Sequence, residues 1–434
     1  MATDKKIGLY EAVSIGIGGM VGGGIFAVLG LAVSLAKGGT PLAFLLAGLL
    51  ALITSYSYAK LSKTFPDRGG TVKFINQGFG KNIFSGSISN LLWISYIIML
   101  SLYASAFGSY APNLLNITSS HEIDFHIYAT AITLLATVVN YYSIAVVGRI
   151  ESYAVFIKLV ILLGFIGIGA FGLIGNPDIS QLSVSYWESP LMLFAGGMVI
   201  FVAYEGFELI ANAAPDIRNP KRNIPRSYYI AVIFVIVLYV LIAIVTVGSL
   251  PFQKIASAQD YVLAEAAKPM TGKIGFTVIT IAALISTFSA INASLYGGSR
   301  VNRVIAKYDE LPHHFLARFW HQPIGLMITA VATLILVNTL DLNSISTAGS
   351  IGFILIFGLV NLVGLKLAGK TGSKKAIPLA GFILSMIALL TLVHQQLQAN
   401  FTGVAISFGI IGSCFLIEWL YKRSERRRSV GKED

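Results

Sequence analysis

Apolar residues along the chain gather into long runs that are separated by short polar segments. A helix needs about 20 apolar residues to cross the roughly 30 Å hydrocarbon core of a membrane, and twelve runs are long enough. The runs lack the alternation of barrel strands, so they predict helices. The expected spans are 12–35, 40–60, 84–110, 127–146, 151–174, 191–213, 228–249, 274–297, 324–340, 345–366, 377–395 and 402–421.

Composition leads to the same class of protein. Of the 434 residues, 55% are apolar and 12% are charged, whereas a soluble protein has about 25% charged residues. This number of charged residues is too small to cover the surface of a soluble protein of this size. We therefore expect most of the surface to face lipid. Disordered, collagen-like and disulfide-scaffold chains are excluded. The one cysteine, Cys414, can form neither an internal disulfide nor a metal cluster.

The basic residues are divided unequally between the two sides of the predicted membrane. Twelve spans put both termini on one side, and that side holds 26 of the 31 Lys and Arg residues, against 4 on the other. Cytoplasmic loops carry the excess of basic residues, so we expect both termini in the cytoplasm of a multi-pass protein of the cell (plasma) membrane. The basic residues behind the net charge of +11 then serve to orient the protein in the membrane, so no nucleic-acid partner is expected.

Two spans contain glycine where a lipid-facing helix has no use for it. The first reads GIGGMVGGGIF from Gly16, and each glycine costs a helix interior about 1 kcal/mol relative to alanine. Three consecutive glycines, 22–24, cover every face, which favours unwinding over helix packing. The sixth span places Glu205 and Glu208 after Gly196 and Gly197. A charge at that depth costs at least about 2.5 kcal/mol, and helix capping is the structural alternative to a functional role.

Interrupted helices at corresponding positions of two halves predict a transporter binding site. Spans one and six are five helices apart, as two inverted repeats require. The half-helix after Gly24 would offer open N–H groups and a positive dipole end to a carboxylate, and the unwound carbonyl groups before it suit an ammonium group. A site with both features is shaped for a free α-amino acid.

Lys158 lies inside the fifth span, nine residues after Arg149, and therefore roughly 13 Å from the membrane edge. Burial disfavours the charged form of an amine, so a lysine at this depth could release and take up a proton, or replace a bound sodium ion. Snorkelling of the side chain to the interface is the alternative. The eighth span supplies hydroxyl groups at Ser286 and Ser289, which could also bond to their own helix.

These residues together resemble a known family. GGGIF in the first span, LLWISY in the third, FVAYEGFE…APDIRNPKRNIPRS in and after the sixth, and NASLYGGSRV in the eighth are similar to signatures of the amino acid–polyamine–organocation (APC) superfamily. Lys158 falls where its ApcT-type proton-coupled amino acid transporters carry a fifth-helix lysine. The resemblance implies an all-α integral membrane protein with a LeuT-like fold. Its 12 transmembrane helices would comprise two inverted five-helix repeats and two extra helices, with helices 1 and 6 unwound mid-membrane.

The resemblance also implies the organisation of the chain. A single membrane transporter domain would extend over 1–434. Its parts would be repeat one over about 10–175, repeat two over about 190–367, extra helices over about 377–421 and a cytoplasmic basic tail over 422–434.

Roles for particular residues follow from the same resemblance. The substrate carboxylate would meet backbone N–H groups at Gly22, Gly23 and Gly24. The substrate ammonium group would meet carbonyl groups at Met20, Val202, Ala203 and Glu205. Lys158 would hold the coupling proton, facing the carbonyl of Gly19 and the hydroxyl of Ser286 or Ser289, and Glu208 matches an acidic position that some members use for proton coupling.

Two residues depart from the family pattern. Val202 replaces an aromatic residue that often gates the pocket, so closure would depend on Phe201 or on another span. Glu205 replaces an apolar residue at the pocket. That glutamate would either pair with a cationic substrate or be held protonated.

The expected function is a secondary active transporter that imports L-amino acids by alternating access, proton-coupled through Lys158. An amino acid/polyamine exchanger using the same pocket is the alternative, and an ion channel is a distant one, because a channel needs a continuous polar lining. No enzyme activity and no catalytic or metal-ligating residues are expected. The expected partners are a free amino acid and the lipid bilayer, with no obligatory protein partner and no cofactor other than the coupling proton.

Overall fold

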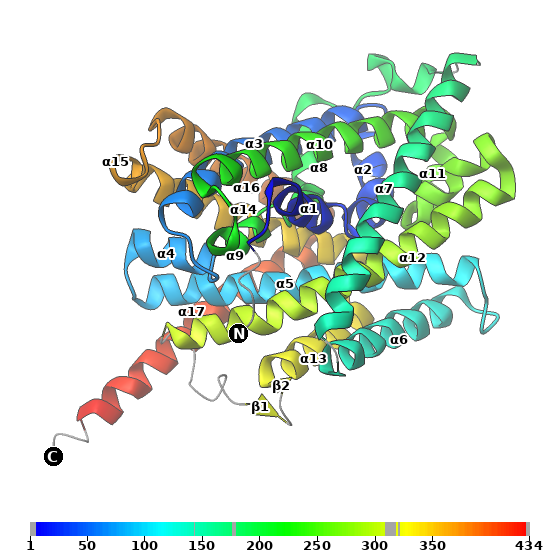
Figure 1. The fold of residues 1–434 in the computed structure, drawn as a ribbon. Coiled ribbons are helices and arrows are strands. Elements are labelled where there is room, and N and C mark those ends of the chain that lie inside the picture. The colour runs from blue at the N-terminus through cyan, green and yellow to red at the C-terminus, as the bar shows by residue number, and fades with distance from the viewer. Residues whose placement is uncertain (1–5, 143, 176–178, 309–317, 320–321, 431–434) are drawn as a thin grey trace.

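The structure is a computed structural model that describes residues 6–142, 144–175, 179–308, 318–319 and 322–430. These ranges are almost entirely helical (Figure 1). The strand β1 (Arg318–Phe319) pairs antiparallel with β2 (Gln322–Pro323), with Arg318 opposite Pro323. The all-α class predicted from the apolar runs is therefore confirmed.

Nine helices within the described ranges are long and apolar enough to cross a membrane. They are α3 (Thr40–Thr64), α5 (Ile83–Tyr110), α6 (His121–Tyr142), α7 (Ile144–Gly175), α10 (Pro220–Ser249), α12 (Val262–Lys307), α14 (Leu342–Lys366), α16 (Ala376–Ala399) and α17 (Phe401–Val430). Each overlaps one predicted span. The predicted tail over 422–434 continues α17 as far as Val430, and its last four residues lie outside the described ranges.

Two further crossings are made of broken helices. The axes of α1 (Leu9–Met20) and α2 (Gly24–Ala36) differ in direction by 47°. In the same way α8 (Pro190–Val199) is bent by 53° from the segment that follows it. That segment contains η4 (Phe201–Tyr204), α9 (Leu209–Ala213) and η5 (Ala214–Asp216). The interruptions predicted in the first and sixth spans are confirmed.

The expected number of twelve crossings is not settled by the described residues. Counting each bent pair as one span gives up to eleven crossings. The predicted span over 324–340 corresponds to α13 (Ile324–Thr339), which has 16 residues. At 1.5 Å per residue it extends about 24 Å, less than the roughly 30 Å of a full crossing. Twelve crossings stay a prediction.

Short helices join the crossings at both ends of the bundle. They are α4 (Thr71–Phe79), η1 (Ala111–Asn113), η2 (Ser180–Leu182), η3 (Val184–Tyr186), α11 (Phe252–Ser257), η6 (Gln259–Tyr261) and α15 (Ala368–Thr371). One long helix also contains a break, because the backbone of α12 leaves helical geometry at Gly272.

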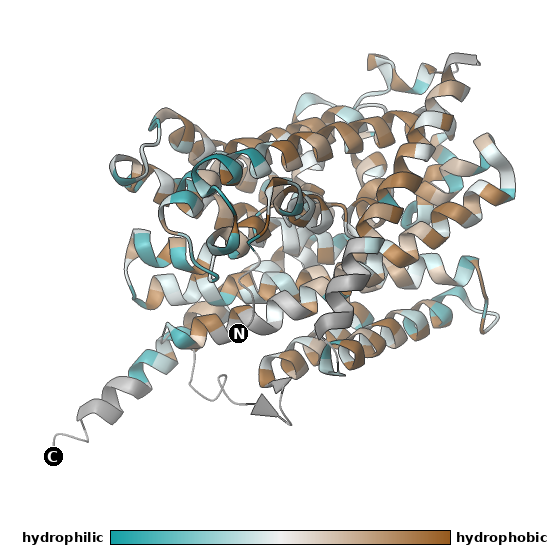
Figure 2. Cartoon of the chain, viewed as in Figure 1, coloured by the Kyte–Doolittle hydropathy of each residue, from teal (hydrophilic) through white to brown (hydrophobic). Residues whose placement is uncertain are grey.

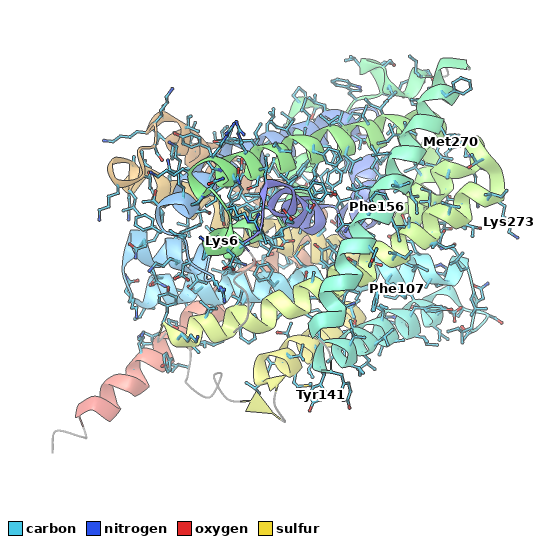
Figure 3. All side chains as sticks on the ribbon, viewed as in Figure 1. Lys6, Phe107, Tyr141, Phe156, Met270 and Lys273 are labelled. Atoms are coloured by element: carbon cyan, nitrogen blue, oxygen red, sulfur yellow. The ribbon has the colours of Figure 1, made fainter. Side chains whose placement is uncertain are left out.

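The surface is that of a membrane protein. Large apolar side chains are exposed along the outer helices, including Leu134 on α6, Phe156 on α7 and Ile233 on α10. Figure 2 shows hydrophobic residues covering these helices, with hydrophilic residues gathered toward α4 and the start of α10. Figure 3 places Lys6 and Lys273 at opposite ends of the helical body. An apolar belt between two polar ends identifies a multi-pass membrane protein.

The broken helices lie in the centre of the bundle. All residues of 20–33 and of 195–208 are buried, and helices α3, α5, α10, α12 and α14 pack around them. A segment that is buried on all sides does not serve as a lipid-facing anchor. The interruptions therefore face protein, where unwound backbone can be satisfied.

Candidate functional site

The carbonyl groups at the end of α1 form the first part of the site. The last four carbonyl groups of a helix have no partner within it, and here each has one from elsewhere. The N–H of Val21 donates to the Ile17 oxygen at 2.8 Å, and the N–H of Gly22 donates to the Gly19 oxygen at 3.3 Å. Lys158 Nζ donates to the Gly18 oxygen at 3.2 Å. The Tyr239 hydroxyl donates to the Met20 oxygen at 2.6 Å. Two distant elements, α7 and α10, thus cap the end of α1, together with the N–H groups of the next two residues.

Lys158 reaches this end of α1 from α7. Its side chain is fully buried, and Nζ donates to the carbonyl of Gly18, one residue before the predicted Gly19. A cation at a helix C-terminus is favoured by the helix dipole and by the unpaired carbonyl groups. Lys158 therefore has a capping role in the structure, and any change in its charge acts directly on the end of α1.

Ser286 contacts the same break from α12. Its hydroxyl donates toward the carbonyl of Val21 at 3.1 Å and also contacts that of Gly22. Ser289 lies one turn further along α12 and is fully buried. The structure thus brings Lys158 and Ser286 to neighbouring carbonyl groups of one unwound segment.

The three consecutive glycines allow three elements to approach the start of α2. A Cβ atom added at Gly22 would lie 2.8 Å from the Cβ of Ala290 in α12. At Gly23 it would lie 2.4 Å from the Tyr103 ring of α5, and at Gly24 it would lie 3.0 Å from Cα of Ala203 in η4. The first N–H groups of α2 lack helical partners, so only a small group can reach them here.

The second break contacts the first through bare backbone. Gly206 has φ +116°, which favours glycine strongly over residues with a Cβ. A Cβ there would lie 2.4 Å from the carbonyl carbon of Gly19 and 2.6 Å from the nitrogen of Met20. The two interrupted helices therefore meet at van der Waals distance at Gly19 and Gly206.

The carbonyl groups predicted to receive an ammonium group have internal partners. The Tyr239 hydroxyl of α10 lies 2.6 Å from the Met20 oxygen and 3.2 Å from the Ala203 oxygen. The Val202 oxygen accepts the N–H of Glu205 at 3.1 Å. A substrate ammonium group would have to displace these donors.

Phe201 and Val202 point toward α14. The ring of Phe201 packs on Phe357 with a centroid distance of 5.9 Å. The Val202 side chain packs against Gly349, and its N–H donates to the Ser350 hydroxyl at 3.1 Å. These two predicted site residues therefore hold the second break against α14.

Two carboxyl groups meet beside the second break. Glu205 and Glu208 are both buried, on either side of Gly206. The Tyr103 hydroxyl donates to Glu205 at 3.3 Å, and the Tyr96 hydroxyl donates to Glu208 at 3.2 Å. The N–H of Gly206 donates to Glu208 at 2.8 Å. A turn at Gly206, and not a continuous helical face, brings the carboxyl groups together.

A cavity of about 20 Å³ connects these groups, which is room for about one water molecule. Its wall includes backbone of Gly18 and Gly19, the side chains of Tyr96, Tyr103 and Glu205, and residues Ala290 and Ser294 of α12. Gly18, whose carbonyl group Lys158 contacts, and Glu205 thus line one cavity. The cavity is too small to hold an amino acid in this structure.

Sequence reasoning missed the three tyrosines that organise the site, namely Tyr96, Tyr103 and Tyr239. All three are buried in helices of crossing length. A buried tyrosine hydroxyl needs a polar partner, and the interrupted spans hold the strongest unpaired groups. This signal would have pointed to tyrosines in mid-span, although it does not say which break each one reaches.

Comparison with known proteins agrees with this geometry. A family model described as amino acid permease matches residues 7–421. An uncharacterised protein of Methanocaldococcus jannaschii is 35% identical over 98% of this chain and 97% of its own length. The inner membrane transport protein YbaT of Escherichia coli is 30% identical over 97% of each chain. Cationic amino acid transporter 9, chloroplastic, of Arabidopsis thaliana is 26% identical over 72% of this chain and 57% of its own.

Two broken helices beside a small cavity, within an apolar bundle whose family and relatives are permeases and transporters, define a membrane transporter and not an enzyme. The chain belongs to the amino acid permease family. The resemblance to the APC superfamily is thereby confirmed.

Proposed function

We propose that the protein is a secondary active transporter that imports L-amino acids by alternating access and is coupled to protons through Lys158. The observation that carries the proposal is the meeting of the two broken helices at Gly19 and Gly206, beside a cavity bounded by Glu205. Open N–H groups at the start of α2 suit a carboxylate. Carbonyl groups nearby suit the α-ammonium group. The name of one relative, a cationic amino acid transporter, supports this substrate class, and the name of another, an inner membrane transport protein, supports transport.

Lys158 provides the proposed coupling. When it is protonated, its charge-assisted bond to Gly18 holds the end of α1 against α7. When it releases the proton, the neutral amine is a weaker donor, and the end of α1 loses the positive charge that stabilised it. The first break can then move relative to α7 and α12 and open the cavity. The proton thus controls the same segment that would bind the substrate.

The proposal includes an orientation in the membrane. Both termini would lie in the cytoplasm of a plasma membrane protein, because the segments on that side hold most of the basic residues. The ranges of about 10–175 and about 190–367 would be inverted repeats, each beginning with one of the broken helices.

Uptake of labelled L-amino acids into proteoliposomes, with and without an imposed proton gradient, tests the proposal. Wild-type protein should concentrate substrate when the outside is acidic. Lys158→Ala should bind substrate but give no gradient-driven accumulation. Lys254→Ala, which changes an exposed lysine of α11, is the matched control and should accumulate substrate as wild type does.

Two results would contradict the coupling. Accumulation by Lys158→Ala in response to the gradient would exclude Lys158 as the coupling residue. Wild-type uptake that ignores the gradient but requires amino acid inside the vesicles would identify an exchanger.

A further inference from the structure

The pair Glu205–Glu208 has a property that the proposed coupling through Lys158 does not use. Glu205 is 3% exposed and Glu208 is 1% exposed. Glu208 accepts the N–H of Gly206, the residue next to Glu205, and this contact brings its carboxyl group beside Glu205. Two buried like charges side by side cannot both ionise, so the pair keeps one proton.

The other contacts assign that proton to Glu205. Glu208 accepts the Gly206 N–H at 2.8 Å and the Tyr96 hydroxyl at 3.2 Å. Glu205 accepts the Tyr103 hydroxyl at 3.3 Å. Hydrogen bonds to the ionised form of a carboxyl group favour that form. Glu208, which accepts two such bonds, is therefore the carboxylate, and Glu205 carries the proton.

With one proton, the pair itself carries a net charge of −1. Among the residues that the structure describes, tyrosine hydroxyls face the pair, and these are neutral in the physiological range. They are Tyr58 of α3, Tyr96 and Tyr103 of α5, and Tyr228 and Tyr239 of α10. The elements α1 and α12 present backbone, alanine and serine to the shared cavity. Lys158 approaches that cavity through the carbonyl of Gly18.

We propose that the shared proton of Glu205–Glu208 is exchanged for an organic ammonium group, so that Glu205 selects cationic substrates. Glu205 lines the cavity, and Glu208 lies behind it. When R–NH₃⁺ enters, Glu205 releases its proton to water and its carboxylate pairs with the ammonium group, so the charge of the site is unchanged. A neutral amino acid binds instead to the protonated pair and releases no proton. This inference rests on the proposed function, because it names the substrate class of that site.

The shared proton can be tested without any substrate. The infrared spectrum of the purified wild-type protein should contain the carbonyl stretch of a buried protonated carboxylic acid. Glu205→Gln should remove that band. Glu418→Gln is the matched control, because Glu418 is a fully buried carboxyl residue that contacts Asn90 away from this cavity. The control should keep the Glu205 band.

Proton release on binding tests the exchange. Purified protein in weak buffer with a pH indicator is titrated with L-lysine and, separately, with L-leucine. We expect about one proton released for each lysine bound and none for leucine. Glu205→Gln, which imitates the protonated acid, should release no proton when lysine binds, and its affinity for lysine should fall at least about tenfold more than its affinity for leucine, a difference equivalent to about 1.4 kcal/mol. Glu418→Gln should still release the proton.

The outcomes separate this inference from the proposed function. If no carboxylic acid band depends on Glu205, or if lysine binds without proton release, the exchange is wrong, and amino acid transport is untouched. If the band is present but neither amino acid binds, the proposal that the substrate is an amino acid is wrong, and the proposed exchange of the proton for an ammonium group is then wrong as well. A Glu205→Gln variant that fails to fold leaves the wild-type titration decisive.

Discussion

Single glycines shape the site because they have no side chain and let neighbouring groups approach the backbone. Gly23 lies so close to Tyr103 that an added Cβ would be 2.4 Å from the ring. We expect Gly23→Leu to abolish substrate binding and uptake, because a side chain would fill the approach to the open N–H groups of α2. Gly164→Leu is the control, since a Cβ at Gly164 of α7 meets no atom within 4 Å. Uptake and membrane expression of both variants check this, and normal transport by Gly23→Leu would refute backbone capture.

Substitution of Gly206 tests which matters more for stability: its positive φ or its close contact with the backbone of Gly19. Both Gly206 and Gly372 have positive φ, +116° and +64°, but a Cβ clashes with Gly19 only at Gly206. Alanine at a left-handed position alone costs about 1–2 kcal/mol. We expect Gly206→Ala to lower the thermal unfolding midpoint clearly more than Gly372→Ala does. Equal shifts in the two midpoints would show that the contact between the breaks contributes little.

At the scale of elements, one hydroxyl links the two broken helices. Tyr239 of α10 reaches the Met20 oxygen at the end of α1 and the Ala203 oxygen of η4. Tyr239→Phe leaves these buried carbonyl groups unpaired, a cost of about 1–3 kcal/mol. We therefore expect slower uptake together with lower thermal stability.

The matched control is Tyr204→Phe, which removes a buried hydroxyl that bonds to the Phe44 oxygen of α3. It should lower stability similarly and spare the relative orientation of the breaks. If both variants transport equally at equal protein amounts, Tyr239 does not couple the two helices.

The positions of the helices were predictable, whereas the contacts between them were not. Glycine runs located both breaks, because the free-energy cost of glycine in a helix depends only on the local sequence. The bond from Lys158 to Gly18, the residue before the predicted Gly19, was not predictable, because contacts from α7 and α10 cap the end of α1. The carboxyl pair depends on the turn at Gly206, which a helical spacing rule does not contain. Such details arise from tertiary contacts between distant parts of the chain.

For the whole molecule, the apolar runs predicted nearly every crossing, and α13 shows the limit of the method. Hydropathy reports that a segment is apolar but not how far its helix extends. The sidedness of the bundle is open to a direct test, because the sequence has one cysteine and Cys414 is buried. Lys6 and Lys273 are exposed at opposite ends (Figure 3).

We expect a membrane-impermeant maleimide added to intact cells to label Lys273→Cys and not Lys6→Cys. Opening the cells should make Lys6→Cys reactive as well, because the positive-inside rule places the N-terminus in the cytoplasm. The parent protein should stay unlabelled in both conditions. Labelling of Lys6→Cys in intact cells would reverse the proposed orientation.

The contact between Gly19 and Gly206 also has a genetic consequence. Most defects caused by a bulkier residue can be repaired by a second mutation that makes its neighbour smaller. Here the neighbour is already glycine, and the obstructing atoms are backbone atoms that every residue shares. Selection for revertants of a Gly206 mutant should therefore return the original codon, whereas a mutant at Gly22, which faces the side chain of Ala290, can be rescued by Ala290→Gly. At the contact between Gly19 and Gly206, no substitution of the neighbouring residue can make room for a side chain at Gly206.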